Sequence, residues 1–199
     1  MNRFSLRTYF PATVDSTLVE GQWRYDTLYH KVPDFQLTSQ TGATFSQKDL
    51  EGKIYVANFF HTTCPSICNQ MSTQLARVQD AFRLKPEVHL VSYTLRPHQD
   101  SVAVLKRYAE SFRANPAKWT FLTGPEPEIL KLAQQGYLLT SPASALPDIP
   151  AEVLSKRLVL VDKEKQVRGI YDGTDATEVD RLITEINVLL SEYNLANGK

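Results

Sequence analysis

Three short, nearly continuous apolar segments constrain the fold of this chain more than any other feature of its sequence. They cover residues 54–60, 88–95 and 119–123, so each has the length of a β-strand and falls well short of the roughly 18 apolar residues of a membrane span. Buried strands that alternate with helices predict a parallel central sheet. The stretch after the first segment carries one apolar stripe at helical spacing, formed by Ile67, Met71, Leu75, Val78 and Phe82.

Two hairpins are expected to add antiparallel strands to this sheet. Residues 33–37 alternate like a strand and lead through a turn at residues 40–42 toward Phe45. Residues 158–162 and 167–171 have the spacing of a second hairpin. The predicted fold class is therefore α/β, with a central mixed sheet flanked by helices and a β-hairpin extension on the N-terminal side.

Helix caps and chain ends complete this outline. Asp100 is expected to cap the helix after the second apolar segment, and Asp175 is expected to cap the last helix. Residues 1–30 carry little periodicity and are predicted to form an extended N-terminal arm. Residues 31–191 are predicted to form one domain, and residues 192–199 a frayed tail.

Composition excludes several classes of protein. The 22 Lys and Arg residues balance 22 Asp and Glu residues, whereas a nucleic-acid binder usually shows a basic excess. Two cysteines are too few for a disulfide-dense scaffold or a four-cysteine zinc site. The first ten residues have a basic start but lack the apolar stretch of a signal peptide. The protein is therefore expected to be cytoplasmic, or to begin just after a membrane anchor.

Both cysteines lie at the junction between the first apolar segment and the helix that follows it, in the sequence Thr63-Cys-Pro-Ser-Ile-Cys68. Cys64 is expected to cap that helix, with Pro65 at its first position and Cys68 one turn further on the same face. The unpaired N–H groups and the partial positive charge of a helix start stabilise a thiolate. Because the thiolate attacks disulfides and binds metal, this junction predicts reactive thiols.

Cys64 and Cys68 are the candidate catalytic and metal-binding residues, and two kinds of chemistry are open to them. Cβ atoms four residues apart in a helix are separated by about 5–6 Å, whereas a disulfide needs roughly 3.5–4.5 Å, so a reversible disulfide depends on looser geometry at Cys64. Paired thiolates also favour a soft ion such as Cu(I). The alternative is that both are small core residues, because cysteine is among the most buried residue types.

Three further side chains near this junction are weaker candidates. His61 lies three residues before Cys64, where it is a candidate third metal ligand or a group that lowers a thiol pKa. An exposed or hydrogen-bonded loop histidine is the favoured interpretation. Arg96 and His98 lie in the loop after the second apolar segment, where side chains line sites in open α/β sheets. Solvated surface side chains are the favoured interpretation for both.

Taken together with these motifs, the sequence from about Tyr29 to Leu190 resembles the SCO/SenC proteins, thioredoxin-fold copper chaperones of cytochrome c oxidase assembly. Residues 29–35 look like the entry strand of that family. Residues 52–56 lead into residues 63–68, which are similar to the family's Cys-Pro-x-x-Cys metal motif. The resemblance implies a thioredoxin-like fold. Its other landmarks are residues 102–109, 119–124 and 160–162.

Two positions depart from the pattern of the family. The family places a distal histidine, its third copper ligand, at the register position that Leu154 occupies here, and the sequence has no histidine after His98. The family's acidic Asp-Pro pair is replaced by Arg96-Pro97. Leucine cannot coordinate a metal, and a nearby cation disfavours one. A Cu(I) site of two thiolates is therefore expected rather than a tight Cu(II) site.

The resemblance implies copper delivery or thiol redox maintenance in cytochrome c oxidase assembly, through Cys64 and Cys68. Copper, with Cu(I) favoured, is the expected ion, and thiol–disulfide exchange is the enzyme activity that the dithiol allows. The expected partner is a copper-site subunit of cytochrome c oxidase or another thiol protein. The implied location is the cell envelope, with attachment through an anchor outside this chain. The alternative is a non-catalytic thioredoxin-fold binding module that has lost metal binding.

Overall fold

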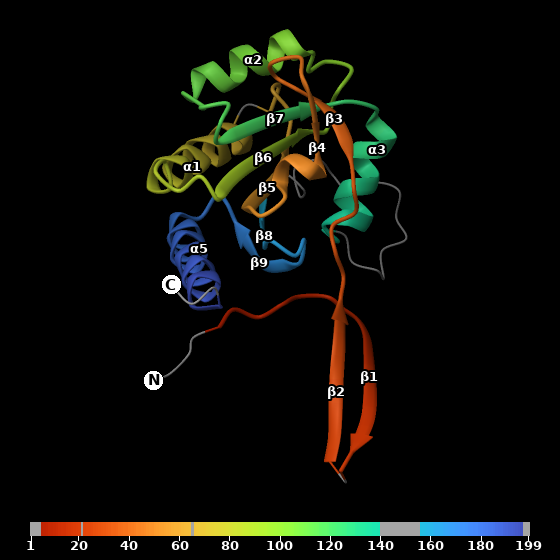
Figure 1. The fold of residues 1–199 in the computed structure, drawn as a ribbon. Coiled ribbons are helices and arrows are strands. Elements are labelled where there is room, and N and C mark those ends of the chain that lie inside the picture. The colour runs from red at the N-terminus through yellow and green to blue at the C-terminus, as the bar shows by residue number, and fades with distance from the viewer. Residues whose placement is uncertain (1–4, 21, 65, 140–155, 197–199) are drawn as a thin grey trace.

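A seven-stranded mixed sheet forms the centre of the molecule, and a separate two-stranded hairpin extends from it (Figure 1). The computed structural model describes residues 5–20, 22–64, 66–139 and 156–196. β5, β6 and β7 are parallel to one another, and the outer strands are antiparallel to their neighbours, so the predicted mixed sheet is confirmed. In spatial order the strands are β4 (Thr44–Ser46), β3 (Gln36–Ser39), β7 (Trp119–Thr123), β6 (Val88–Thr94), β5 (Ile54–Phe60), β8 (Arg157–Val161) and β9 (Val167–Asp172).

Helices cover both faces of this sheet (Figure 1). α1 (Ile67–Ala81), α2 (Val102–Ser111) and α5 (Ala176–Ala196) pack on one face. α3 (Glu126–Lys131), the π-helical turn Leu132–Gly136 and the 3₁₀ turn Gln47–Leu50 pack on the other face. Within the described ranges, no helix combines the length and the apolar character that crossing a bilayer requires.

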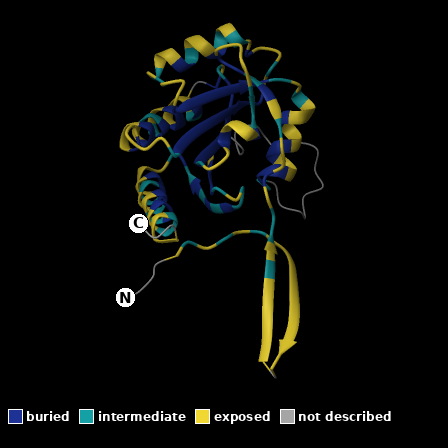
Figure 2. Ribbon diagram, in the orientation of Figure 1, coloured by how far each residue is buried: buried dark blue, intermediate teal, exposed yellow. Residues whose placement is uncertain are grey.

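The central strands contribute side chains to two separate cores. On β5, Val56 and Phe60 face the core beneath α1, α2 and α5, whereas Tyr55 and Phe59 face the core beneath α3. Every residue of β5 and of β6 is buried (Figure 2). Because both faces are covered, these strands consist of continuous apolar runs instead of alternating patterns.

The expected cap of α2 is wrong. α2 begins at Val102, and its cap is Ser101, whose hydroxyl accepts a hydrogen bond of 3.4 Å from a backbone N–H of the first turn. Asp100 has no exposed surface, and its carboxylate accepts hydrogen bonds from Thr62 and Thr94. Its carboxylate is therefore directed to the loop after β5 instead of to its own helix.

Cys64 is not the cap of α1, because the helix begins three residues later at Ile67 and its cap is Ser66. The backbone N–H of Cys64 donates to the carbonyl of His61 at 3.2 Å. This bond keeps residues 61–64 in a tight turn that ends before the helix. Pro65 lies outside the described residues.

The N-terminal segment, for which the sequence predicts an extended arm, forms an antiparallel hairpin of β1 (Pro11–Val19) and β2 (Gln22–Tyr29). Both strands are exposed along almost their whole length (Figure 2). Backbone hydrogen bonds of 2.8 Å fasten the base of the hairpin to the end of the sheet, one from Tyr9 to Val167 and one from Val32 to Lys165. A hairpin extension is therefore confirmed.

A buried ion-pair cluster joins three parts of the chain beside β9. Arg168 pairs with Asp162 at 3.0 Å and with Glu192 of α5 at 3.1 Å. The Arg168 guanidinium also donates to the carbonyls of Leu6 and Arg7 at 2.8 and 3.0 Å. These contacts hold α5 against the sheet as far as Glu192, and the helix continues to Ala196. The division into an arm of residues 1–30, a domain of residues 31–191 and a tail of residues 192–199 stays a prediction.

Replacing Arg168 by Ala is expected to lower the free energy of unfolding by about 3–5 kcal/mol, because it removes the charged partner of a buried carboxylate. Urea denaturation measures this loss. The control is Arg77→Ala, which breaks an exposed pair with Asp180 (2.6 Å) and is expected to cost less than about 1 kcal/mol. Equal losses from the two variants would contradict the structural role of Arg168.

His89 is a buried histidine of β6 whose Nε2 lies 2.9 Å from the hydroxyl of Thr120. Burial, together with the nearby charges of Lys53 and Lys118, lowers the pKa of His89 from 6.5 to about 4. The unfolded chain therefore takes up a proton near pH 6.5, whereas the folded chain does so only near pH 4. Stability is consequently lost as the pH falls through this window.

The loss of unfolding free energy across this window is expected to reach at most about 3.5 kcal/mol, since each unit of pKa is worth about 1.4 kcal/mol. Urea denaturation at a series of pH values checks it, with His89→Gln as the comparison. The variant lacks the titrating ring and is expected to show a shallower dependence on pH. Identical slopes for the two proteins would rule out His89 as the source.

Candidate functional site

The candidate site lies in the turn after β5, at the carboxyl end of the central parallel strands. β5 pairs with β6 in a register that sets Phe60 opposite Thr94. The backbone N–H of Leu95 donates to the carbonyl of Phe60 at 2.7 Å, and the two chains then separate into adjacent loops. The loop after β5 carries the cysteines, and the loop after β6 carries Asp100.

Cys64 and Cys68 form a disulfide, with their Cα atoms 5.6 Å apart. The backbone N–H of Cys68, in the first turn of α1, donates to the Sγ of Cys64 at 3.3 Å. The predicted contact between a helix start and a cysteine sulfur is therefore present, although Cys64 precedes the helix. Cys64 is 6% exposed and Cys68 is fully buried, so of the two cysteines only Cys64 has any exposed surface.

The imidazole of His61 completes a group of three side chains that could hold a metal ion. Its ligand nitrogen and the two sulfurs all lie within 4.8 Å of one another, and all three residues are buried. The Nδ1 of His61 lies 3.0 Å from the Oγ1 of Thr63. His61 is therefore hydrogen-bonded but not exposed, and it lies beside the sulfurs.

The chemistry of this group fits a soft cation. Thiolate and imidazole are ligands of Cu(I), whereas hard cations prefer carboxylate and carbonyl oxygens. Thiolates bind metal and disulfide sulfurs do not, so the fit applies to the reduced protein. In that state Cys64, Cys68 and His61 are the residues that would hold the ion.

Hydrogen bonds fix the turn that carries this group. The Asp100 carboxylate accepts from the backbone N–H of Thr62 at 3.2 Å and from the hydroxyls of Thr62 and Thr94. Of these residues, the sequence indicates only Asp100, and it does so as a helix cap instead of a partner of this turn. The available signal was the polar pair Thr62-Thr63 directly before Cys64, together with an acidic residue that closes the loop after the second buried strand.

The structure also places two of the weaker candidates. The Nη1 of Arg96 donates to the Oγ1 of Thr63 at 3.1 Å, so Arg96 reaches the turn beside Cys64 instead of extending only into solvent. His98 faces Glu126 at 3.2 Å, and 84% of its side chain is exposed. Leu154, at the register position of the family's distal histidine, lies outside the described residues.

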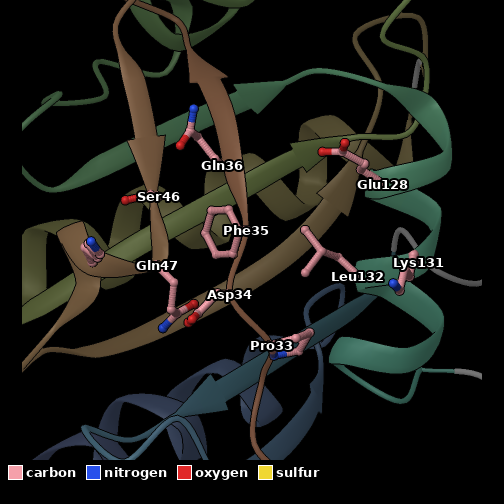
Figure 3. Close-up of a pocket in the computed structure, with 10 residues that line it drawn as sticks. Pro33, Asp34, Phe35, Gln36, Ser46, Gln47, Glu128, Lys131 and Leu132 are labelled. Atoms are coloured by element: carbon pink, nitrogen blue, oxygen red, sulfur yellow. The ribbon is translucent and has the colours of Figure 1, made fainter.

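A pocket of about 720 Å³ lies on the opposite face of the sheet (Figure 3). Its walls are residues 33–36 and 46–48 on one side and three side chains of α3 and the turn after it, Glu128, Lys131 and Leu132, on the other. The cysteines and His61 are absent from its lining. The pocket is therefore separate from the cysteine site.

Comparison with known protein families supports the resemblance seen in the sequence. A family model described as SCO1/SenC matches residues 25–191, a range that includes both cysteines and the whole central sheet. The chain belongs to the SCO1/SenC family.

Individual SCO proteins are similar over most of this chain. The SCO1 protein homolog of Bacillus subtilis is 26% identical over 169 residues, which cover 83% of this chain and 86% of that protein. The crystal structure of a SCO1/SenC family lipoprotein from Bacillus anthracis matches with a TM-score of 0.69 and 28% identity, over 80% of this chain and 95% of that one. Yeast Sco1 with copper bound has the same fold, with a TM-score of 0.60 and 24% identity over 79% and 92% of the two chains. The thioredoxin-like fold is thereby confirmed.

Proposed function

We propose that this SCO1/SenC protein binds Cu(I) and passes it on during assembly of cytochrome c oxidase, through Cys64, Cys68 and His61. The convergence of two sulfurs and one imidazole nitrogen within 4.8 Å carries this proposal. Copper is the cargo of such a protein. Membership of the family supports the assembly role, and a yeast relative with this fold has been solved with copper bound.

Reduction of the disulfide has to precede binding of the ion. A thiolate of an external dithiol attacks the Sγ of Cys64, the bond to Cys68 breaks, and its electron pair leaves on Cys68 as a thiolate. The second thiol of the dithiol then cleaves the mixed disulfide, so that the dithiol is oxidised and both cysteines are reduced. The N–H of Cys68 at 3.3 Å stabilises the thiolate released at Cys64.

Cu(I) is proposed as the ion in preference to Cu(II). Two sulfurs and one nitrogen form a soft donor set, whereas Cu(II) favours tetragonal sites with nitrogen and oxygen ligands. The guanidinium of Arg96 reaches Thr63, next to Cys64. Its positive charge disfavours the more highly charged ion.

The proposed partner is a copper-site subunit of cytochrome c oxidase or another thiol protein, in the cell envelope. The relative from Bacillus anthracis is described as a lipoprotein, which supports this location. An oxidising compartment also allows the disulfide to persist at rest. Because only Cys64 has exposed surface, the partner thiol has to approach from its side.

A non-catalytic binding module is the second proposal, and the burial of the sulfurs favours it. Cys68 has no exposed surface, and thiols buried in apolar surroundings are inert. Such a module would dock a partner without binding metal or exchanging thiols.

Titration with Cu(I) under anaerobic conditions separates the two proposals. The reduced protein is expected to take up one ion per chain in competition with a chromogenic chelator. The oxidised protein and a Cys64→Ser, Cys68→Ser double variant are the controls and are expected to take up none, because no thiolate pair is present. Reduced protein that binds no Cu(I) would refute copper delivery and favour the binding module.

Replacing His61 by Gln tests the third ligand. Cu(I) affinity is expected to fall at least about tenfold, since even partners of the ligands contribute 10–100-fold to metal affinity. X-ray absorption of the bound copper should lose its nitrogen scattering. His98→Gln is the matched control, because His98 is exposed and bound to Glu126. An unchanged affinity and spectrum for the His61 variant would show that His61 does not bind the ion.

A further inference from the structure

We propose that Asp100 is a positioning residue that keeps the two sulfurs and the imidazole converged after the disulfide is reduced. The inference rests on the proposed function of the cysteine site. It begins from an unusual placement: Asp100 follows the loop after β6 and has no exposed surface, although it carries a carboxylate.

The Asp100 carboxylate binds Thr62, which lies within the turn of residues 61–64. One oxygen accepts from the backbone N–H of Thr62 at 3.2 Å and from the hydroxyl of Thr94, and the other accepts from the hydroxyl of Thr62. The hydroxyl of Thr94 in turn accepts from the backbone N–H of Arg96 at 3.0 Å. The turn after β5 is thereby tied to the end of β6 and to the loop that follows it.

This arrangement is costly, and helix capping does not explain it. The hydrogen bonds of Asp100 come from two hydroxyls and one backbone N–H, and the ion pairs found among the described residues do not include it. Burying a carboxylate without a cation is unfavourable. Ser101 caps α2. What the carboxylate does provide is a fixed position for Thr62, between His61 and Cys64.

The bonds of Asp100 are independent of sulfur chemistry. In the oxidised protein the disulfide itself holds Cys64 against Cys68. Reduction removes that link, and two neighbouring thiolates repel each other. The bonds from Asp100 to Thr62 involve no sulfur, so they persist and keep His61 and Cys64 in the turn that presents them to Cys68.

A positioning role has a signature that a charge effect cannot produce. Holding the two thiols together raises their effective concentration, which favours both capture of one Cu(I) and closure of the disulfide. Loss of the positioning residue therefore weakens both. An electrostatic role also weakens Cu(I) binding when the charge is removed, because a nearby negative charge favours a cation, but it predicts no change when Thr62 loses its hydroxyl and the Asp100 carboxylate stays.

Asp100→Asn tests the proposal, since it keeps the shape of the side chain and replaces one acceptor oxygen by a donor. Cu(I) affinity of the reduced protein is expected to fall about 10–100-fold. The disulfide is expected to be reduced more readily by dithiothreitol, and each tenfold change in that equilibrium corresponds to about 30 mV for a two-electron couple. Unchanged or higher Cu(I) affinity in the folded variant would overturn the proposal.

Two sets of controls separate positioning from loss of stability. Asp162→Asn alters another buried carboxylate, paired with Arg168 beside β9, and is expected to lower the unfolding free energy without changing either readout. Thr62→Val and Thr62→Ser separate positioning from charge, because both keep the Asp100 carboxylate, and they replace Asp100→Asn if that variant does not fold. Valine removes the hydroxyl that donates to Asp100 and is expected to weaken both readouts, whereas serine keeps it and is expected to restore them. Equal behaviour of the two Thr62 variants would refute the proposal.

Measuring the disulfide equilibrium separates the test of Asp100 from the test of copper binding. If the wild-type protein binds no Cu(I), the proposed function fails, and the shift in the disulfide equilibrium still decides whether Asp100 positions the thiols. If the wild-type protein binds Cu(I) and Asp100→Asn changes neither readout, only the inference about Asp100 fails.

Discussion

The parallel pairing of β5 with β6 is the constraint on which the site depends. Its register places Phe60 opposite Thr94, so the loops that follow the two strands begin at the same level. Asp100 can therefore reach Thr62, although 38 positions separate them in sequence. Both strands are buried on both faces, and this fixes their position more firmly than surface strands would allow. The hydrogen bonds of Asp100 to Thr62 and Thr94 connect the cysteine turn to these strands.

The strands of the central sheet could be predicted because each is a run of apolar residues, and burial on two faces produces such runs. The helix starts could not be predicted with the same accuracy. Asp100 is chemically suited to cap a helix, and only the neighbouring loop, which the register of β5 and β6 brings close, directs its carboxylate elsewhere. An N-terminal hairpin extension was predicted, but its position at residues 11–29 was not, because strands that are exposed on both faces show no periodic apolar pattern.

The candidate site could be predicted from the sequence only in part. The spacing of Cys64 and Cys68 around a proline at a strand end predicts a sulfur pair, and the pair lies where it was expected. The place of His61 beside the sulfurs depends on the turn of residues 61–64, whose conformation the composition does not specify. The supporting hydrogen bonds join segments distant in sequence, so they become visible only once the strands are aligned.

The hairpin and the cysteines lie at opposite ends of the central sheet. β8 runs antiparallel to β5, so the β8–β9 turn that fastens the hairpin lies at the amino end of β5, whereas the cysteines lie beyond its carboxyl end. The hairpin extends away from the body (Figure 1). Any contact made along the exposed hairpin therefore lies at the opposite end of the sheet from the turn that carries the cysteines.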